Sequence, residues 1–312
     1  MCLLLANALF FHQAAVWSAA WLYRTSYGNI TAGGRPRRRP AAAWLDALVM
    51  RLAVFVPRDV RLLMVKDLRL FRRDPVQWSQ FLIFFGLLGF YFINIRRYRY
   101  DVNFVGWWVN MISFLNLAVI GLILSTFTTR FVFPMISLEG RRFWFLGLLP
   151  ISRGRILWGK FLFAAIGSTV CCNTLIAVSD AMLRIDPWVV AMHQVTCAVL
   201  CVGLSAIAVG LGARLPDLRE QSPARIAAGF GGTLNLVLSA IYIVVVVLLT
   251  AIPCHLYIHF LQSQPNVSPD NDHLRQLRAW MIQAALASVA LGLLVTALTL
   301  STGLRAFRKM EF

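Results

Sequence analysis

The sequence predicts an all-α protein that crosses a membrane several times. Of its 312 residues, 59% are hydrophobic and only 14% are charged, whereas charged residues make up about 25% of an average soluble domain. The apolar residues form long runs without Lys, Arg, Asp or Glu, such as 105–129 and 230–269. A membrane-spanning helix needs roughly 20 mostly apolar residues. The basic residues stand at the ends of these runs, as expected of a polytopic helical membrane protein.

Seven apolar segments are long enough to be membrane spans. They are residues 2–23, 78–95, 105–128, 161–183, 188–213, 230–252 and 280–304. Cytoplasmic loops carry an excess of Lys and Arg. Four alternate connecting stretches hold 24 of the 30 basic residues: 24–77, 129–160, 214–229 and 305–312. We therefore predict a multi-pass protein of the cell membrane with a cytoplasmic C-terminus, although the Arg96–Arg99 cluster runs against the rule locally.

The first apolar segment is set apart from the other six. No positive charge precedes the apolar segment 2–23 within residues 1–23, so it makes a poor signal peptide. We predict an extra N-terminal span there, and a remnant of a longer N-terminal half is one explanation for it. Residues 24–57 follow as a cytoplasmic basic linker containing GGRPRRRP, whose arginines suit either water or an anionic lipid surface. The six-span unit then occupies residues 58–312.

Residues 59–74, DVRLLMVKDLRLFRRD, predict an amphipathic helix at the membrane surface. At 100° per residue, one arc is apolar and contains Val60, Leu63, Met64, Leu68, Leu70 and Phe71. The opposite arc is basic and contains Arg61, Lys66, Arg69, Arg72 and Arg73, with Leu62 and Val65 straying onto it. Asp67 falls on the apolar arc. It is either neutralised by a neighbouring Arg or Lys, or it attaches this helix to a cytoplasmic loop.

GRILWGKF, residues 154–161, is similar to a phosphate-binding P-loop but lacks its chemistry. A P-loop is a turn between a strand and a helix, and a Ser or Thr after its Lys binds magnesium. Phe161 occupies that position, and Pro150 interrupts any preceding strand. We therefore expect no nucleotide or other cofactor to be bound by this chain and no ATPase activity of its own. Lys160 is expected to mark the cytoplasmic start of a span.

The sequence also offers no other catalytic or metal-binding pattern. The five His are scattered, and the six Cys lie within or beside apolar runs, where thiols behave as small hydrophobes. Asp180 and His193 lie near span ends, so no carboxylate is expected near the membrane midplane, where coupling ions bind. This favours an energy source outside the membrane. The positive-inside pattern accounts for the basic charge without nucleic acid.

A family resemblance rests on two groups of residues. The first is Lys66-Asp67 followed by Arg73-Asp74-Pro75, and the second is Glu139-Gly140-Arg141 with Trp144, Leu148 to Ser152 and Gly159-Lys160. In this order they resemble the membrane (permease) subunit of type-two ABC exporters, especially a bacterial group of ABC exporter permeases. The resemblance covers about residues 58–308.

The resemblance implies a fold of six transmembrane helices preceded by a connecting helix, working as a homo- or heterodimer of permease units within membrane lipids. It also implies a separate cytoplasmic ABC ATPase subunit. The coupling segment is then 137–149, and its contact residues are Glu139, Gly140, Arg141, Arg142 and Trp144. The connecting helix carries Lys66, Asp67, Arg73 and Asp74, and a second cytoplasmic loop carries Asp217, Glu220 and Arg225.

The function that follows is export of an unidentified substrate, driven by ATP hydrolysis in the partner subunit. The alternative is a non-transporting membrane scaffold or a membrane enzyme of unfamiliar type. Neither the substrate nor the choice between homo- and heterodimer can be read from the sequence.

Overall fold

A computed structural model describes most of the chain and confirms that it is helical. Its described residues are 9–20, 47, 50–51, 54–73, 79, 82–83, 86, 89–90, 106–142, 151–183, 185–220, 222–263 and 272–309. Every regular element in these ranges is a helix. The chain divides into two compact units, Met1–Leu48 and Val49–Phe312. In the first unit, residues 9–20 are helical, and a span over 2–23 stays a prediction.

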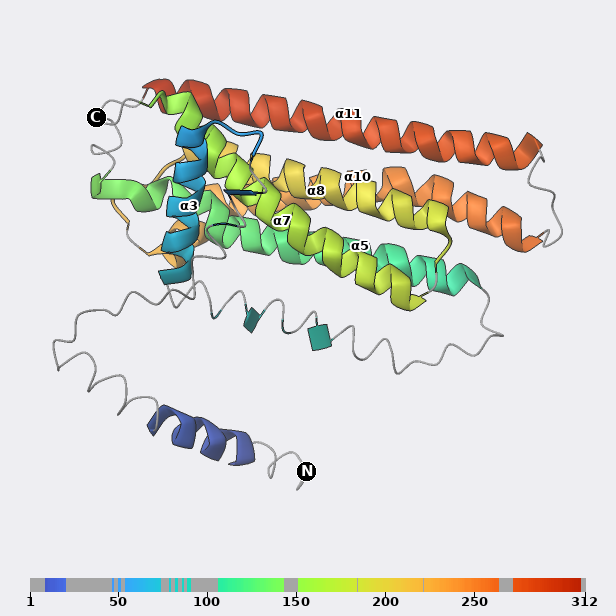
Figure 1. Ribbon diagram of the computed structural model, residues 1–312, viewed down its shortest axis with the longest axis horizontal. Helices are drawn as coiled ribbons and strands as arrows, with labels where there is room; N and C mark the ends of the chain where they lie inside the picture. Colours follow the sequence, from blue (N-terminus) through green and yellow to red (C-terminus); the bar gives the residue numbers. More distant parts are fainter. Residues whose placement is uncertain are drawn as a thin grey trace. The chain divides into compact units, whose positions relative to one another are not determined.

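Five long helices make up most of the second unit and run side by side (Figure 1). They are α5 (Gly106–Phe127), α7 (Arg153–Leu183), α8 (Pro187–Arg214), α10 (Phe230–Ser263) and α11 (Asp272–Lys309). The shorter elements are α3 (Arg58–Arg73), η2 (Thr128–Val132), η3 (Phe133–Met135), η4 (Ser137–Arg142) and α9 (Pro223–Ala228). Figure 1 shows α3 lying across the bundle at the end where α7 begins.

The structure contains five helices, among the described residues, that are long and apolar enough to cross a membrane. They correspond to five of the six spans predicted after residue 77. The sixth, 78–95, lies mostly outside the described residues, and its described positions are helical. The six-span count therefore stays a prediction.

Several helices extend beyond the apolar segments that predicted them. α7 begins at Arg153 rather than near 161, because Ser152 accepts the first N–H groups and Ile156 and Leu157 pack into the core. α10 continues through Pro253 to Ser263, and α11 begins at Asp272. At 1.5 Å per residue these helices are roughly 45–57 Å long, which exceeds the hydrocarbon thickness of about 30 Å.

α8 is the central helix of the bundle. Its most apolar stretch is 72% buried, whereas those of α10 and α11 are 28% buried. α8 packs very closely against α11, and a Cβ on Gly303 would lie 2.8 Å from the carbonyl oxygen of Gly210. Small residues allow membrane helices to approach in this way. The backbones of α8 and α11 are therefore in contact here.

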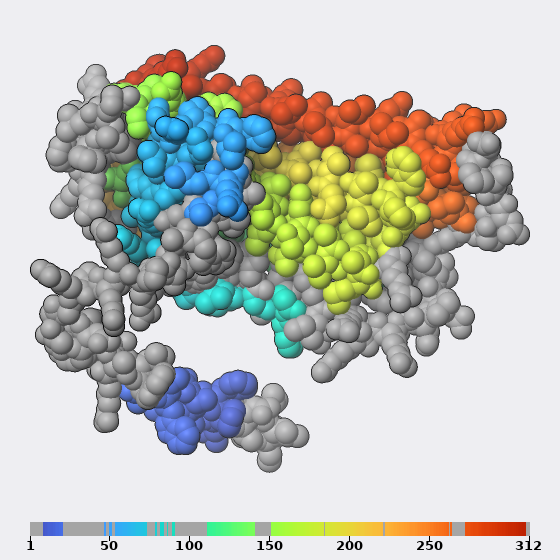
Figure 2. All heavy atoms as spheres, viewed as in Figure 1, coloured from blue at the N-terminus to red at the C-terminus, as the bar shows by residue number. Residues whose placement is uncertain are grey.

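α3 (Arg58–Arg73) lies where a helix is predicted over 59–74, and part of it is buried against the rest of the protein. Val60, Leu63, Met64, Val65 and Asp67 are buried, and Leu63 packs over Gly159 of α7. Leu70 of the apolar arc is 53% exposed, and Val65, which strays onto the basic arc, is buried. Figure 2 shows α3, in blue, on the outer surface of the second unit, and its Arg69 and Arg73 are exposed. Contact with a membrane surface stays a prediction.

Candidate functional site

Four charged side chains meet where α3, η4 and α7 come together; we call them the ion cluster. They are Lys66 and Asp67 on α3, Glu139 on η4 and Lys160 on α7. Lys66 Nζ donates to Glu139 Oε1 at 2.9 Å and lies 3.6 Å from Asp67 Oδ1. Lys160 Nζ lies 3.7 Å from Asp67 Oδ1, and it also donates to Glu139 Oε1. Two cations thus share two carboxylates.

The ion cluster is mostly shielded from solvent. The exposed fractions of its side chains are 38% for Lys66, 11% for Glu139, 5% for Lys160 and 3% for Asp67. A hydrogen bond from Lys160 Nζ to the Met135 carbonyl, 3.3 Å long, adds a backbone partner. A buried charge is strongly unfavourable unless it is paired. Removal of one member would therefore leave an opposite charge buried without its partner.

An apolar layer beneath the ion cluster holds the three elements together. It contains Leu63 from α3, Ile156, Leu157 and Phe161 from α7, Phe133 and Ile136 next to η4, and Phe307 from α11. Fully burying one such side chain is worth about 1.5–3 kcal/mol. The geometry of the charged groups is therefore fixed by packing as well as by their mutual attraction.

The chain reaches η4 through an irregular continuation of α5. Thr128 and Thr129 donate their hydroxyls to the Ser125 carbonyl at 3.0 and 2.8 Å, and side-chain bonds of this kind bend helices. Pro134 then lacks a backbone N–H, and the helix tightens. Gly140 has a φ of 33°, which favours glycine, and the chain bends there. Glu139 is positioned immediately before this bend.

The second predicted cytoplasmic loop is joined to the same segment. The backbone N–H of Asp217 donates to Ser137 Oγ at 3.1 Å. The Asp217 carboxylate accepts the N–H groups of Arg219 and Glu220 and so orders the turn. Glu220 pairs with Arg225 at 3.5 Å, but the Arg225 side chain is 79% exposed. Asp217 therefore has a structural connection to η4, while Arg225 lies on the outside.

Some of the predicted site residues lie together in the structure, and others lie elsewhere or outside the described residues. Lys66, Asp67 and Glu139 come together, because Lys66 lies near both carboxylates and Asp67 also lies 3.7 Å from Lys160. Arg73 is exposed at the end of α3. The side chains of Arg141 and Arg142, and all of Trp144 and Asp74, lie outside the described residues.

Sequence reasoning missed the role of Lys160. The sequence predicts only that Lys160 marks the start of a span, whereas in the structure it is a buried member of the ion cluster. The signal was present, since Lys160 lies one helical turn after Ile156 and Leu157 and directly before Phe161, all of them buried. A lysine among inward-facing apolar residues requires a buried acidic partner.

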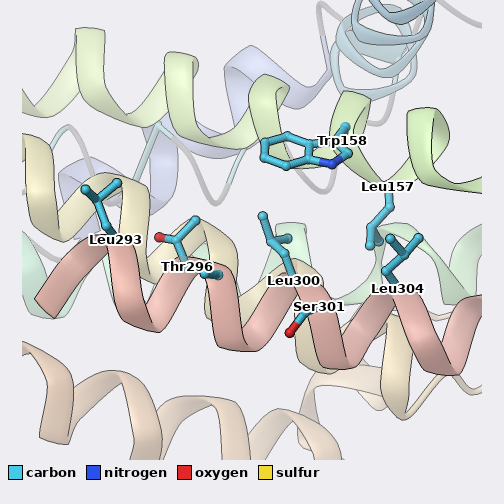
Figure 3. Close-up of a pocket in the computed structure, with 8 residues that line it drawn as sticks. Leu157, Trp158, Leu293, Thr296, Leu300, Ser301 and Leu304 are labelled. Atoms are coloured by element: carbon cyan, nitrogen blue, oxygen red, sulfur yellow. The ribbon is translucent and has the colours of Figure 1, made fainter. Parts of the chain in front are cut away.

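A groove between α7 and α11 differs from the ion cluster because its lining is uncharged. Its volume is about 370 Å³. Figure 3 shows Trp158 and Leu157 of α7 facing the α11 residues that line its other side. The lining consists of Leu157, Trp158, Leu293, Thr296, Ala297, Leu300, Ser301 and Leu304. Because none of these side chains is charged, the groove suits an apolar chain rather than a phosphate group.

Metal ligands are not clustered in the part of the chain that the structure describes. No group of three His, Cys, Asp or Glu side chains could hold a metal ion there. The described cysteines are free thiols.

Comparison with known proteins identifies a family over the full length. A family model described as "putative ATP-binding cassette" matches residues 1–312. The comparisons with curated proteins and with solved structures give no match. The five apolar helices and this match are consistent with a membrane-embedded component of an ABC transporter. The chain thus belongs to the putative ATP-binding cassette family.

Proposed function

We propose that this chain is the transmembrane permease subunit of an ATP-driven ABC exporter. A separate nucleotide-binding subunit hydrolyses ATP, and the chain moves an unidentified substrate across the cell membrane. The observation that carries the proposal is the ion cluster, which joins the connecting helix α3, the loop helix η4 and the membrane helix α7. Such a junction is required if force applied to a cytoplasmic loop is to move a membrane helix.

The ion cluster can transmit motion because separating its ion pairs costs free energy. Glu139 contacts a lysine on α3 and a lysine on α7. Displacing η4 alone would break both contacts and leave charges unpaired in a mostly dry site, which is unfavourable. It is therefore favourable for α3 and α7 to follow η4, and Ser137 passes the same displacement to the second loop through Asp217.

The region 154–160 supports hydrolysis by a partner rather than by this chain. These residues form the first turns of α7, not a turn between a strand and a helix. The Lys160 ammonium, which would contact phosphates in a P-loop, is bound by Glu139, Asp67 and the Met135 carbonyl. In the proposed complex, the ATPase contacts 137–149 from the cytoplasm, and Arg141, Arg142 and Trp144 are the residues expected to bind it.

The exposed apolar faces of α10 and α11 support contact with a second copy of the chain and with lipid. The most apolar stretches of α10 and α11 are only 28% buried within one copy. Faces of this kind need hydrocarbon or another helix around them. A homodimer or heterodimer of permease units in the bilayer supplies both.

Co-purification tests the proposal against the alternative of a membrane scaffold. The tagged chain is extracted in mild detergent, and the proteins bound to it are identified and quantified. A permease is expected to retain one soluble protein that has a complete P-loop, with Ser or Thr after the Lys, in about equal amount. The Arg141→Glu variant should lose this protein, and Arg275→Glu, an exposed position near the start of α11 at the other end of the bundle, should keep it. Absence of any P-loop protein from the intact complex contradicts the proposal.

A further inference from the structure

The proposed function assigns no role to the groove between α7 and α11. The groove has a volume of about 370 Å³, and leucine side chains from both helices and one indole ring lie along it (Figure 3). Its two hydroxyl side chains add little polarity. Thr296 Oγ1 is itself buried, and Ser301 Oγ donates to the Leu298 carbonyl at 3.0 Å. The groove therefore presents mainly carbon atoms to a ligand.

The length of the groove matches one half of a bilayer. Its α11 lining extends from Leu293 to Leu304, about 16 Å along the helix axis at 1.5 Å per residue. The hydrocarbon core of a bilayer is about 30 Å thick, so each leaflet contributes about half of that distance. An acyl chain from one leaflet can therefore lie along the whole groove.

Arginine side chains follow the groove at one end. Arg305 comes four residues after Ser301, and Arg308 comes four residues after Leu304. Residues four apart are neighbours on a helix surface, and both arginines are exposed. In the opposite direction, α11 has no charged residue between 279 and 304. The groove thus has an apolar interior and a basic mouth.

The basic mouth is held in place by contacts between the start of α7 and the end of α11. Arg153 Nη1 donates to the carbonyls of Phe307 and Arg308 at 3.3 and 2.9 Å. A Cβ added to Gly154 would lie 3.7 Å from Leu304 Cδ1. The backbone that carries Arg308 is therefore attached to α7 beside the groove.

Nearby acidic groups do not offset the charge of the mouth. Residues 298–312 contain three cations and one carboxylate, that of Glu311. Residues 143–160 contain three cations and no acidic residue. The acidic residues of α3 and η4 near the start of α7 lie in ion pairs with other cations: Asp59 with Arg155, Asp67 with Lys66 and Lys160, and Glu139 with Lys66 and Lys160. A net positive charge therefore remains at the mouth.

We propose that this groove binds one anionic phospholipid, with an acyl chain between α7 and α11 and the phosphate group beside Arg305 and Arg308. Basic pockets between membrane helices on the cytoplasmic side bind anionic headgroups, and a guanidinium can donate two parallel hydrogen bonds to a phosphate. Trp158, which is 48% exposed, lines the groove, and tryptophan is enriched where hydrocarbon meets headgroups. The inference rests on the membrane orientation given under the proposed function, but not on export.

Photo-crosslinking in vesicles locates the lipid. The full chain is placed in phosphatidylcholine vesicles that contain a small, fixed fraction of phosphatidylglycerol with a diazirine at the end of one acyl chain. Mass spectrometry identifies the attachment sites, which we expect at Trp158 and within 293–304. Replacing part of the phosphatidylcholine by unlabelled phosphatidylglycerol should suppress attachment there but not on the exposed apolar faces elsewhere. Because no ATPase is present, failure of this test is distinct from failure of the proposed function.

Two variants at the same depth test whether the groove is the site. Ala297→Trp fills the groove and should abolish the attachment that phosphatidylglycerol suppresses, and its exposed position keeps the indole out of the core. Leu298→Trp is the matched control, because Leu298 is 56% exposed and does not line the groove. It should keep that attachment. Ser301→Trp, at another exposed lining position, replaces Ala297→Trp if that variant does not fold.

Removal of charge tests the headgroup. Each Lys or Arg near an anionic lipid surface is worth about fivefold in affinity, so Arg305→Gln combined with Arg308→Gln should weaken phosphatidylglycerol binding about 25-fold. Arg275→Gln, exposed near the other end of α11, should leave binding unchanged. Equal suppression by both lipids, or suppressible attachment that survives Ala297→Trp, overturns the proposal. A groove without lipid attachment, together with loss of dimers in Ala297→Trp, would assign it to a second copy and also overturn the proposal.

Discussion

Asp67 Oδ1 on α3 lies 3.7 Å from Lys160 Nζ on α7, and their side chains are only 3% and 5% exposed. A second ion pair, Asp59 with Arg155, joins the same two helices at 3.0 Å, but its side chains are 46% and 55% exposed. Helices α3 and α7 are thus joined by one buried ion pair and one exposed ion pair. The two should differ greatly in energy, because solvent weakens exposed pairs to about 0–1 kcal/mol.

Substitution of Lys160 by Met should strongly destabilise the protein. The change leaves Asp67 and Glu139 with Lys66 as their shared cation, and breaking a buried pair in this way costs about 3–5 kcal/mol. The matched control is Arg155→Met, for which we expect a loss of about 1 kcal/mol or less. Unfolding in detergent measures both. Equal losses in the two variants would show that the ion cluster has no special role in stability.

Glu139→Gln should separate ATP hydrolysis from transport in the complex with the ATPase. The amide keeps the shape of the side chain but weakens its attraction to Lys66 and Lys160, so η4 can move without α3 and α7. Coupling between sites is typically worth 5–150-fold, and we expect transport per ATP hydrolysed to fall by a factor in that range. Proteoliposomes that contain the complex allow both rates to be measured.

The control for this change is Asp59→Asn, which weakens the exposed ion pair between α3 and α7. The side chains of Asp59 and Arg155 are 46% and 55% exposed, so transport per ATP should stay close to that of the wild type. A normal ratio in Glu139→Gln would remove the ion cluster from the coupling mechanism.

Gly210→Ala should disrupt the contact between α8 and α11. An added Cβ would overlap the backbone carbonyl of Thr299, which cannot move aside as a side chain can. Overpacking of this kind costs typically 1–3 kcal/mol. Gly167→Ala on α7 is the matched control, because nothing lies within 4 Å of its added Cβ. In a helix that change should be neutral or stabilising by up to about 1 kcal/mol, and thermal unfolding of the two variants compares them.

Gly140→Ala should strain the bend after Glu139. The φ of 33° is a conformation that alanine rarely adopts, and the new Cβ would lie 3.3 Å from the Leu218 carbonyl oxygen. Strain of this type costs of order 1–3 kcal/mol. We expect the variant to insert normally but to show faster proteolysis around residues 137–142. An unchanged cleavage rate would show that the bend relaxes without loss of stability.

The sequence predicted the helical architecture well because apolar runs of this length have few alternatives. α5, α8 and α10 begin within one residue of the predicted spans. The ends were harder to predict, since α7 and α11 begin in polar or mixed sequence that is helical through tertiary packing. The buried face of α3 also depended on tertiary contacts, because Asp67 lies 3.7 Å from Lys160 of α7 and Val65 is buried although it strays onto the basic arc.

The site was predicted in part, and the missing part had a common cause. Lys66, Asp67 and Glu139 were identified from local motifs that also resemble a family. Lys160 was missed as a partner because its contacts are with Asp67 and Glu139, which lie on other elements of the fold. A single sequence shows where an ionisable residue interrupts an apolar run, but the packing decides which opposite charge it meets.

ATP hydrolysis, measured with the chain alone and with its co-purified partner, tests directly whether the partner is the ATPase of the complex. The chain is purified to homogeneity in nanodiscs, and the P-loop protein is removed and then added back. We predict no ATP hydrolysis above background from the chain alone. With the partner added back, the rate of hydrolysis should depend on the amount of partner. Hydrolysis by the isolated chain that persists without the partner would contradict it.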